Sequence, residues 1–232
     1  MASEVDIANL ALSRLGDDAT VSSLTPPEGS AQAEHCATFY PIARDSLLEM
    51  HNWGFATQRA ALAPVDVPYD AGFLYAYAAP ADIIQVIAVL PPDAPDNYTA
   101  SLGRIPGYVS YGPNFCDGNG AFVTRSYDIP QDFAMEVAAD GTLIILTNQP
   151  DASARYVIRV SDTTKFSPLF VDALSWYLAS MLAGPLIKGD VGAAESKRCL
   201  QFFNAIMGRA MVSDSRQQQI RPTQNVPWIG NR

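Results

Sequence analysis

The chain has few of the residues that most often bind metals or build disulfides. Its 232 residues include three cysteines and two histidines. Cys36, Cys116 and Cys199 are far apart, and no two of them form a CxxC pair, so the pattern favours neither a disulfide framework nor a zinc site. His35 and His51, if both lie on one straight helix, are roughly 24 Å apart at 1.5 Å per residue. They cannot bind the same metal ion, and we expect the protein to hold none.

Short catalytic signatures are also missing. No serine stands in a GxSxG motif, and no glycine cluster matches a phosphate-binding loop or a dinucleotide fingerprint. We therefore expect no cofactor and no enzymatic activity. One catalytic alternative stays open, because a glycoside hydrolase needs only two carboxylates at a suitable separation and acidic residues are plentiful in this chain.

Long hydrophobic runs and basic stretches are scarce as well. The longest apolar stretch, Ile83–Leu90, has the length of a strand, and the acidic, amphipathic start of the chain does not resemble a signal peptide. We expect no membrane contact, and synthesis in a reducing cytoplasm. The formal net charge of −9 argues against a protein that coats nucleic acid, although an acidic channel would let DNA slide through an oligomer.

The charge is unevenly distributed along the chain. Residues 1–160 contain 19 acidic and 7 basic side chains, whereas residues 161–232 contain 5 acidic and 8 basic ones. Such asymmetry suits head-to-tail contacts between copies, or a basic C-terminal segment that meets an acidic partner. Solvated faces that merely differ in charge would give the same totals, so both interpretations stay open.

Helical periodicity occurs at both ends of the chain. Ser3 with Asp6, Ser30, and Ser167 with Pro168 are predicted helix starts. Asp190 is predicted to cap a last helix that ends near Val212, and Gly16 is a predicted stop. Gly184 and Pro185 are predicted to end or kink the third helix, and Pro41 predicts a kink or break in the second helix, which is expected to end near Asn52. The predicted buried positions are Ile7, Leu10, Ala11 and Leu15; Cys36, Tyr40, Ala43, Leu47 and Met50; Phe170, Leu174, Tyr177, Leu178 and Met181; and Leu200, Phe203, Ile206, Met207 and Ala210.

Between the helices the pattern changes to that of strands. Strands are predicted at Tyr75–Ala78, Ile83–Leu90, 133–138, Leu143–Thr147 and 155–160, with Asp140 and Gly141 as a hairpin turn. The sequence therefore predicts an α+β fold: an α-helical bundle from the N- and C-terminal helices, an inserted antiparallel β lobe and an extended C-terminal tail. The predicted boundaries are 1–60 and 161–213 for the helical body, 61–160 for the β lobe and 214–232 for the tail.

The predicted tail carries the candidate partner-binding residues. Trp228 lies in a segment without helical or strand period, where there is no core for it to fill, and tryptophan is a favoured interface anchor. Arginines nearby supply donors for an acidic partner. We predict that the tail becomes ordered on docking; folding back onto its own subunit is the alternative. The predicted contact residues are Arg216, Arg221, Pro222, Val226, Pro227, Trp228 and Ile229.

Several blocks of the sequence resemble a known family. They are residues 7–12 with 14–16; Ala33, Cys36, Tyr40, Arg44, Leu47 and Leu48; residues 53–56 with Arg59 and Ala60; residues 146–148 through Tyr156; residues 166–168 with Ala173, Leu174, Leu178 and Ala179; and Ala210, Asp214 and residues 227–229. In these blocks the chain resembles tail tubular protein A and related head-to-tail adaptors of short-tailed phages. The resemblance spans nearly the whole chain outside the loop 91–120, and it rests on apolar and aromatic spacing without a catalytic signature.

The resemblance implies a structural virion protein. Such adaptors form rings of twelve copies that bind beneath the portal after DNA packaging, continue the DNA channel and seat the tail nozzle or tube. Double-stranded DNA passes through the ring without sequence-specific binding. Their C-terminal segments commonly reach the portal, which agrees with the role predicted for Trp228. The implied location is the neck of the virion, after synthesis in the host cytoplasm.

Two other functions remain open at this point. One is a tail-associated glycan hydrolase that uses a carboxylate pair in the β lobe. The other is a cellular binding module whose β lobe recognises a small ligand, which would require a deep pocket that the sequence does not reveal.

Overall fold

Two compact units make up the chain. The computed structural model describes residues 2–66, 72–92, 115–116, 122–123 and 131–217. The helical unit comprises Met1–Gln58, Asp82–Gln85 and Tyr156–Gln218, and the β unit comprises Arg59–Ala81, Val86–Arg155 and Gln219–Arg232. The described residues combine α-helices with antiparallel sheets, which confirms the predicted α+β class.

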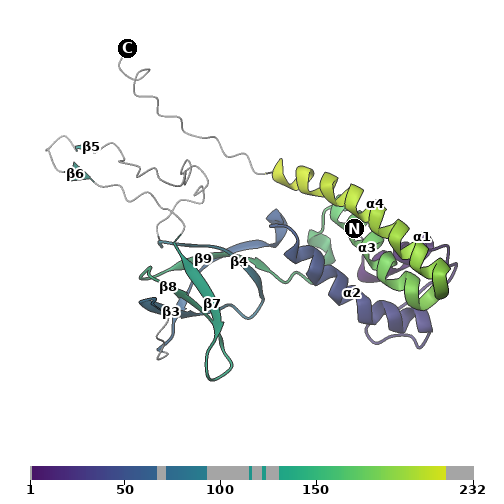
Figure 1. The fold of residues 1–232 in the computed structure, drawn as a ribbon, viewed down its shortest axis with the longest axis horizontal. Coiled ribbons are helices and arrows are strands. Elements are labelled where there is room, and N and C mark those ends of the chain that lie inside the picture. The colour runs from purple at the N-terminus through teal and green to yellow at the C-terminus, as the bar shows by residue number, and fades with distance from the viewer. Residues whose placement is uncertain (1, 67–71, 93–114, 117–121, 124–130, 218–232) are drawn as a thin grey trace, which may run out of the picture. The chain divides into compact units, whose positions relative to one another are not determined.

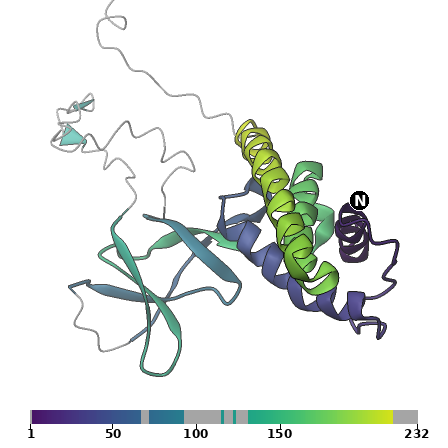
Figure 2. The same cartoon turned by 45° about the vertical axis from the view of Figure 1, so that its right-hand side comes forward.

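Four α-helices build the helical unit: α1 (Glu4–Arg14), α2 (Ala31–Glu49), α3 (Pro168–Ile187) and α4 (Gly189–Ser215). α3 packs against each of the other three, and α4 lies alongside α3 in both views (Figure 1, Figure 2). Short 3-10 helices occupy Gly54–Ala56 after α2 and Thr163–Lys165 before α3. The largest fully buried side chains of this unit include Trp53, Phe170, Ile7, Leu12, Leu47 and Leu174.

The starts of α1, α2 and α3 depend on side-chain capping, as predicted. The Ser3 hydroxyl accepts the N–H of Asp6 while the Asp6 carboxylate accepts the N–H of Ser3, which is a complete capping box. The hydroxyls of Ser30 and Ser167 each accept an N–H from three residues further on. α1 stops just before Gly16, whose φ of +75° is a conformation that glycine adopts without steric cost.

Several predicted helix boundaries differ from those in the structure. Gly184 and Pro185 do not end α3, which continues to Ile187, and α4 begins at Gly189 without a cap from Asp190. α2 ends at Glu49 rather than near Asn52, and its helix is assigned continuously through Pro41. A proline inside a helix removes one hydrogen bond and crowds the preceding turn. Burial of the residues around it offsets that cost in both helices, since Tyr40, Ala43, Leu182 and Ala183 are all in the core.

The turn between α3 and α4 is tight. Lys188 takes a left-handed conformation with a φ of 61°, and the chain returns at once along α3. The approach is so close that a Cβ atom at Gly192 would stand 2.9 Å from the carbonyl oxygen of Ala183. This backbone contact between two helices is a tertiary feature, and local propensity contains no signal for it.

Most of the predicted helical stripes are buried, but some of their members are not. Leu10, Met50 and Leu200 are exposed, whereas Leu15, Tyr177, Met181 and Ile206 are half-buried; the other predicted positions are in the core. Ala8 and Leu12 join Ile7 and Ala11 as the buried residues of α1. The apolar residues of each helix therefore occupy a wider part of the helix surface than the part that neighbouring helices bury.

The third helix has the length and composition of a membrane span. The 18-residue window that meets this criterion is half buried inside the protein, and α3 packs against α1, α2 and α4. The sequence pattern gives no uninterrupted apolar run of this length because Asp172, Ser175 and Ser180 divide it. The composition of α3 is accounted for by its place between three helices.

An antiparallel sheet in the β unit has the strand order β2 (Ala63–Pro64), β3 (Tyr75–Ala78), β8 (Leu143–Thr147) and β7 (Phe133–Val137). The predicted bounds of β3 and β8 are confirmed, and β7 ends one residue earlier than predicted. The β7–β8 hairpin turns at Asp140 and Gly141, as predicted, and Gly141 has a φ of +85°. Ala76, Ile144 and Leu146 form a buried cluster on this sheet.

A three-stranded sheet has the order β1 (Thr57–Ala61), β9 (Ser153–Ile158) and β4 (Ile83–Leu90). The bounds of β4 are those predicted, and β9 begins and ends two residues before its predicted position. β5 (Phe115–Cys116) and β6 (Phe122–Val123) pair with each other antiparallel. The chain passes between the two units within β1, β4 and β9, after residues 58, 85 and 155.

Candidate partner-binding face on the last helix

One residue of the predicted tail contacts, Arg216, lies among the described residues, where it caps the C-terminal end of α4. The other six, Arg221, Pro222, Val226, Pro227, Trp228 and Ile229, lie outside the described residues. α4 continues to Ser215, so the helix passes residue 214, at which the sequence pattern places the start of the tail. The end of α4 is therefore the part of the predicted site that the structure describes.

Asp214 explains why the helix extends so far. Its carboxylate is buried, both oxygens accept the backbone N–H of Gly54 at 3.1 Å, and one oxygen lies 3.2 Å from Nε2 of His51. A buried carboxylate is costly unless its oxygens are hydrogen-bonded. These contacts join the last turn of α4 to the turn after α2, 160 residues earlier in the chain. The last turn is thereby part of the folded unit.

An aromatic cluster lies beneath this junction. The indole of Trp53 is fully buried, and its Nε1 donates to the carbonyl oxygen of Leu47 at 2.8 Å. Its ring centroid is 4.8 Å from that of His51 and 5.0 Å from that of Phe170, both in edge-to-face arrangements. Phe55 adds a further edge-to-face contact to Phe170 at 5.1 Å. Trp53 is therefore a core residue, and the cluster gives the end of α4 a rigid base.

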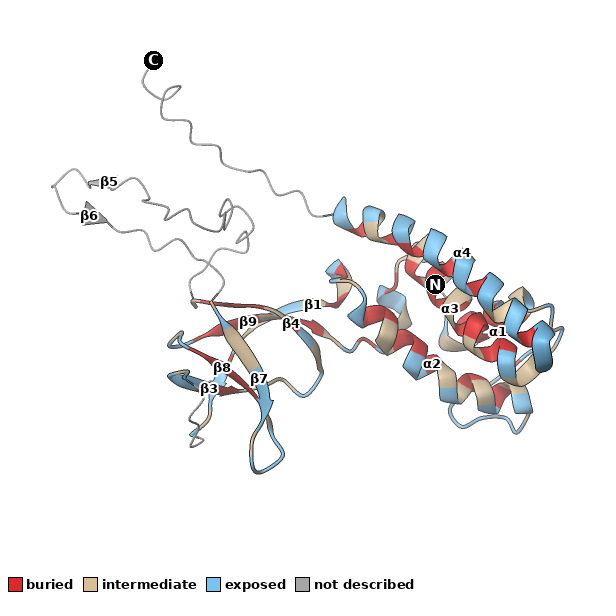
Figure 3. Ribbon diagram, viewed as in Figure 1, coloured by how far each residue is buried: buried red, intermediate tan, exposed pale blue. Residues whose placement is uncertain are grey.

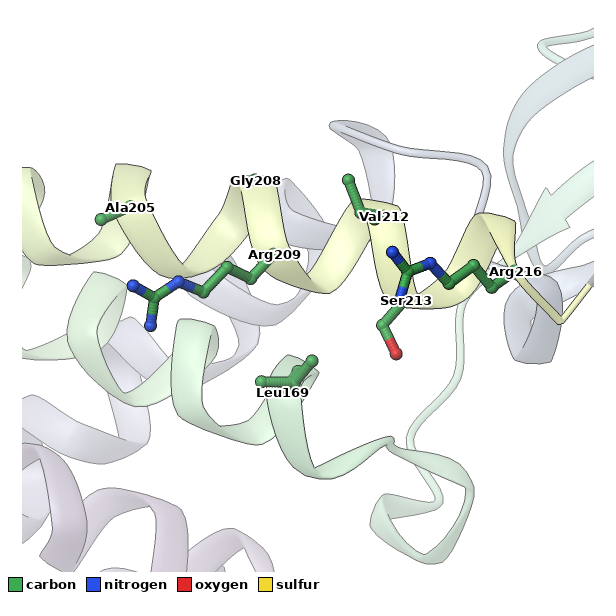
Figure 4. Close-up of a pocket in the computed structure, with 7 residues that line it drawn as sticks. All are labelled: Leu169, Ala205, Gly208, Arg209, Val212, Ser213 and Arg216. Atoms are coloured by element: carbon green, nitrogen blue, oxygen red, sulfur yellow. The ribbon is translucent and has the colours of Figure 1, made fainter.

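An open groove runs between the start of α3 and the C-terminal half of α4 (Figure 4). Its volume is about 520 Å³. Leu169 comes from α3 and the remaining lining from α4 (Figure 4). The lining residues are Leu169, Ala205, Gly208, Arg209, Val212, Ser213 and Arg216. Small residues at 205 and 208 leave room beside the helix backbone, so the groove can take side chains of another segment.

The groove belongs to a longer exposed surface of α4. We define the outer face of α4 by five exposed residues, Phe202, Ala205, Arg209, Val212 and Arg216, which follow one another at spacings of three and four. That spacing places them on one side of the helix. Phe202 and Val212 are 46% and 53% exposed. Figure 3 shows the same helix with its buried residues directed at α3 and its exposed ones away from it.

Two arginines give this outer face a positive charge. Both Arg209 and Arg216 are exposed, and in the described part of the chain neither forms an ion pair. A guanidinium donates two parallel hydrogen bonds to a carboxylate, so an unpaired arginine beside apolar groups suits an acidic, partly apolar partner. Val212 lies between the two arginines along the helix and supplies the apolar part.

The groove and the described residues around it contain no metal-binding grouping. No set of three or more His, Cys, Asp or Glu side chains there could hold a metal ion. Ser213 supplies the hydroxyl of the groove lining, which includes Arg209 and Arg216 but neither a histidine nor a carboxylate (Figure 4). A nucleophilic serine needs an adjacent base. The groove therefore has the chemistry of a docking surface.

The N-terminal end of the outer face is stiffened by stacking. The ring of Phe202 stacks on Trp176 of α3 with centroids 4.7 Å apart, and the guanidinium of Arg14 lies 4.2 Å from the centroid of Trp176. Arg14 also pairs with the carboxylate of Asp172, and Arg198 donates to the Arg14 carbonyl oxygen at 3.0 Å. Phe202 is thus exposed but held in one orientation, which lowers the entropy lost on binding.

The sequence pattern identifies the inner stripe of α4 but not the outer face. The buried positions of Phe203, Met207 and Ala210 are predicted correctly. For Phe202, Arg209 and Val212 the sequence pattern predicts no role. The signal that could have found them is the pair of large apolar residues, Phe202 and Val212, which lie off the predicted buried stripe on a helix already supplied with a core face.

A comparison with protein-family models finds no match to this chain, and a comparison with curated proteins finds none either.

Proposed function

We propose that this chain is the subunit of a phage head-to-tail adaptor: a structural, non-enzymatic ring protein of the virion neck. It would be made in the host cytoplasm, assemble in about twelve copies beneath the portal, continue the DNA channel and seat the tail nozzle or tube. The sequence resemblance supports this assignment, and the number of copies is taken from that resemblance alone.

One structural observation carries the proposal: the outer face of α4. This helix exposes two large apolar side chains and two arginines that form no ion pair with any residue that the structure describes, all on one side. Exposed apolar side chains flanked by cationic ones beside an open groove can mark a protein interaction site. Covering the exposed half of such a side chain stabilises a complex by about 1 kcal/mol. The face is therefore suited to protein partners within an assembly.

The connection of this face to the tail adds to the proposal. α4 is joined to the body by Asp214, and the chain continues from Gln217 into the segment with Trp228 and its neighbouring arginine, Arg221. A partner bound on the outer face of α4 is therefore close along the chain to the predicted portal contacts. We propose that the portal contacts residues 218–232 and that the body forms the ring.

The hydrolase alternative gains no support from the described residues of the β unit. A general acid in a glycosidase needs a raised carboxyl pKa. The pKa of Asp140, on the β7–β8 turn, is instead lowered, because the N–H of Thr142 donates to its carboxylate. Clearing of envelope glycan in a zymogram with the purified protein would contradict the non-enzymatic assignment.

The decisive experiment measures the mass of the purified protein with and without the portal of the same phage, by light scattering. We expect a complex with one adaptor per portal subunit. A chain that ends at Gln217 should lose this attachment and keep its helical circular dichroism. The cut is placed there because an earlier one would remove the buried Asp214 and damage the body.

Point variants separate the tail from the body. Trp228→Ala should weaken portal attachment, and Trp228→Phe, which keeps a large aromatic ring, should weaken it less. No association between the full chain and the portal would contradict the adaptor function. Equal attachment by the full chain and by the chain that ends at Gln217 would contradict the role of the tail alone.

A further inference from the structure

A second exposed stripe lies on α2. Glu34, Thr38, Ile42, Asp45 and Glu49 follow one another at spacings of three and four, so they share one side of the helix. Ile42 is 51% exposed at its centre, and Glu34 and Glu49 are exposed at its ends. We call this stripe the outer face of α2. It has the pattern of the outer face of α4 with the opposite charge.

The carboxylates of the α2 stripe differ in whether they are paired within the chain. Asp45 pairs with Arg44 at 2.9 Å and with Arg159 at 2.9 Å, so its charge is compensated within the chain. Glu34 and Glu49 form no ion pair in the described ranges. The free charges of this face are therefore the two glutamates, with Ile42 between them.

The two faces match in spacing as well as in charge. On α4, Phe202, Ala205, Arg209, Val212 and Arg216 repeat at 3, 4, 3 and 4 residues, and on α2 the run from Thr38 to Glu49 repeats at 4, 3 and 4. Stripes with this alternation pack side by side at a shallow crossing angle. Ile42 and Glu49 are separated by seven residues, as are Phe202 and Arg209, so an apolar pair and an ion pair can form together.

A single copy does not use this match. Within the described residues, no ion pair joins Glu34 or Glu49 to Arg209 or Arg216. Both helices pack on α3, and the contact between their ends is made by Asp214 with the turn after α2. Each copy thus keeps one acidic and one basic face of equal pattern, which is what a head-to-tail contact between identical subunits requires.

We propose that the outer face of α4 in one copy binds the outer face of α2 in the next copy. The closure of such contacts into a ring rests on the proposed adaptor function. The contact itself needs only two copies of this chain. In this contact Phe202 covers Ile42 while Arg209 meets Glu49. The acidic face of α2 and the basic face of α4 thus attract each other, in the same sense as the uneven charge of the sequence.

Charge reversal tests the contact in the full chain by sedimentation velocity over a range of concentrations. Wild type associates as its concentration rises, and raised salt weakens the association because exposed ion pairs are screened. Arg209→Glu and Glu49→Arg each weaken association by about tenfold or more, since each places like charges opposite one another. The double variant with both reversals regains association.

Mixing the single variants gives a sharper result. The glutamate of an Arg209→Glu copy meets the arginine of a Glu49→Arg copy, and the two unchanged residues meet at the next contact, so the mixture assembles although neither variant does alone. Lys197→Glu and Asp18→Arg are matched controls, because both change exposed residues outside the two faces. They should leave association unchanged.

The outcomes separate this proposal from the adaptor function. A wild-type chain that stays monomeric at its highest soluble concentration, or a double variant that fails to recover, overturns the contact between α2 and α4. If both single variants still attach to the portal and self-association is unchanged by the charge reversals, the contact is overturned and the adaptor function is retained. If the single variants lose self-association, the double variant regains it and no variant attaches to the portal, the contact is supported and the adaptor function is contradicted.

Discussion

The inner and outer faces of α4 are alike in spacing and opposite in environment. The inner face carries Cys199, Phe203, Met207, Ala210 and Asp214, all buried, at spacings of three and four. The outer face lies one or two positions earlier at each turn and has the same spacing, but its residues, among them the large apolar Phe202 and Val212, are exposed. A periodic apolar stripe therefore shows that a helix side will be covered, but not whether the cover is the same chain or another molecule.

The neighbouring phenylalanines of α4 give the largest contrast. Phe203 is 4% exposed and packs on Tyr177, whereas Phe202 is 46% exposed on Trp176. We expect Phe203→Ala to lower the free energy of unfolding by about 3–5 kcal/mol. Phe202→Ala should cost about 1 kcal/mol, mainly from the lost ring contact. Urea unfolding of both variants measures the difference, and equal losses would show that the two faces do not differ as described.

The second contrast uses the buried carboxylate at the end of α4. Asp214→Ala leaves the N–H of Gly54 and the ring of His51 without their acceptor, and we expect a loss of about 1–3 kcal/mol in unfolding free energy. Asp214→Asn keeps one acceptor oxygen and should cost less. Ser213→Ala, one residue away on the groove side, is the control and should change stability little. Amide hydrogen exchange would locate the loss in the last turn of α4.

The third contrast compares two glycines of one helix. Gly192→Ala forces a methyl group to within 2.9 Å of the Ala183 carbonyl oxygen, so we expect a loss of about 1–2 kcal/mol from displaced backbone. Gly208→Ala has nothing within 4 Å of the new methyl group and should instead gain about 0.5–1 kcal/mol from helix propensity. Thermal unfolding should shift in opposite directions for the two variants. Shifts of the same sign would contradict the close approach at Gly192.

The sequence predicts those features whose causes are local. The caps at Ser3, Ser30 and Ser167 depend on a hydroxyl and an N–H three residues away, and β3, β4 and β8 depend on alternation or on short apolar runs. The α+β class follows from these elements.

Features caused by distant residues are not predicted. α3 passes Gly184 and Pro185, and α4 reaches Ser215, because of tertiary partners: Ala183 beside Gly192, and Gly54 beside Asp214. The exposure of Phe202 and Val212 is of the same kind, since it depends on which side of α4 the helix α3 covers. The predicted site at residues 221–229 lies outside the described residues, and the outer face of α4 is found only when burial is known.

The smallest effect on stability is expected at the arginines of the outer face. Arg209→Ala and Arg216→Ala remove exposed cations without an ion pair in the described chain, so the free energy of unfolding should change by no more than about 0.5 kcal/mol. Their effect on association should be much larger, because the same charges meet carboxylates at an interface. Urea unfolding and sedimentation velocity on the same samples measure both quantities. A variant that loses association while keeping its unfolding midpoint would assign the outer face to a partner, whereas a matching loss of stability would mean that these arginines, like Asp214, serve the fold of their own chain.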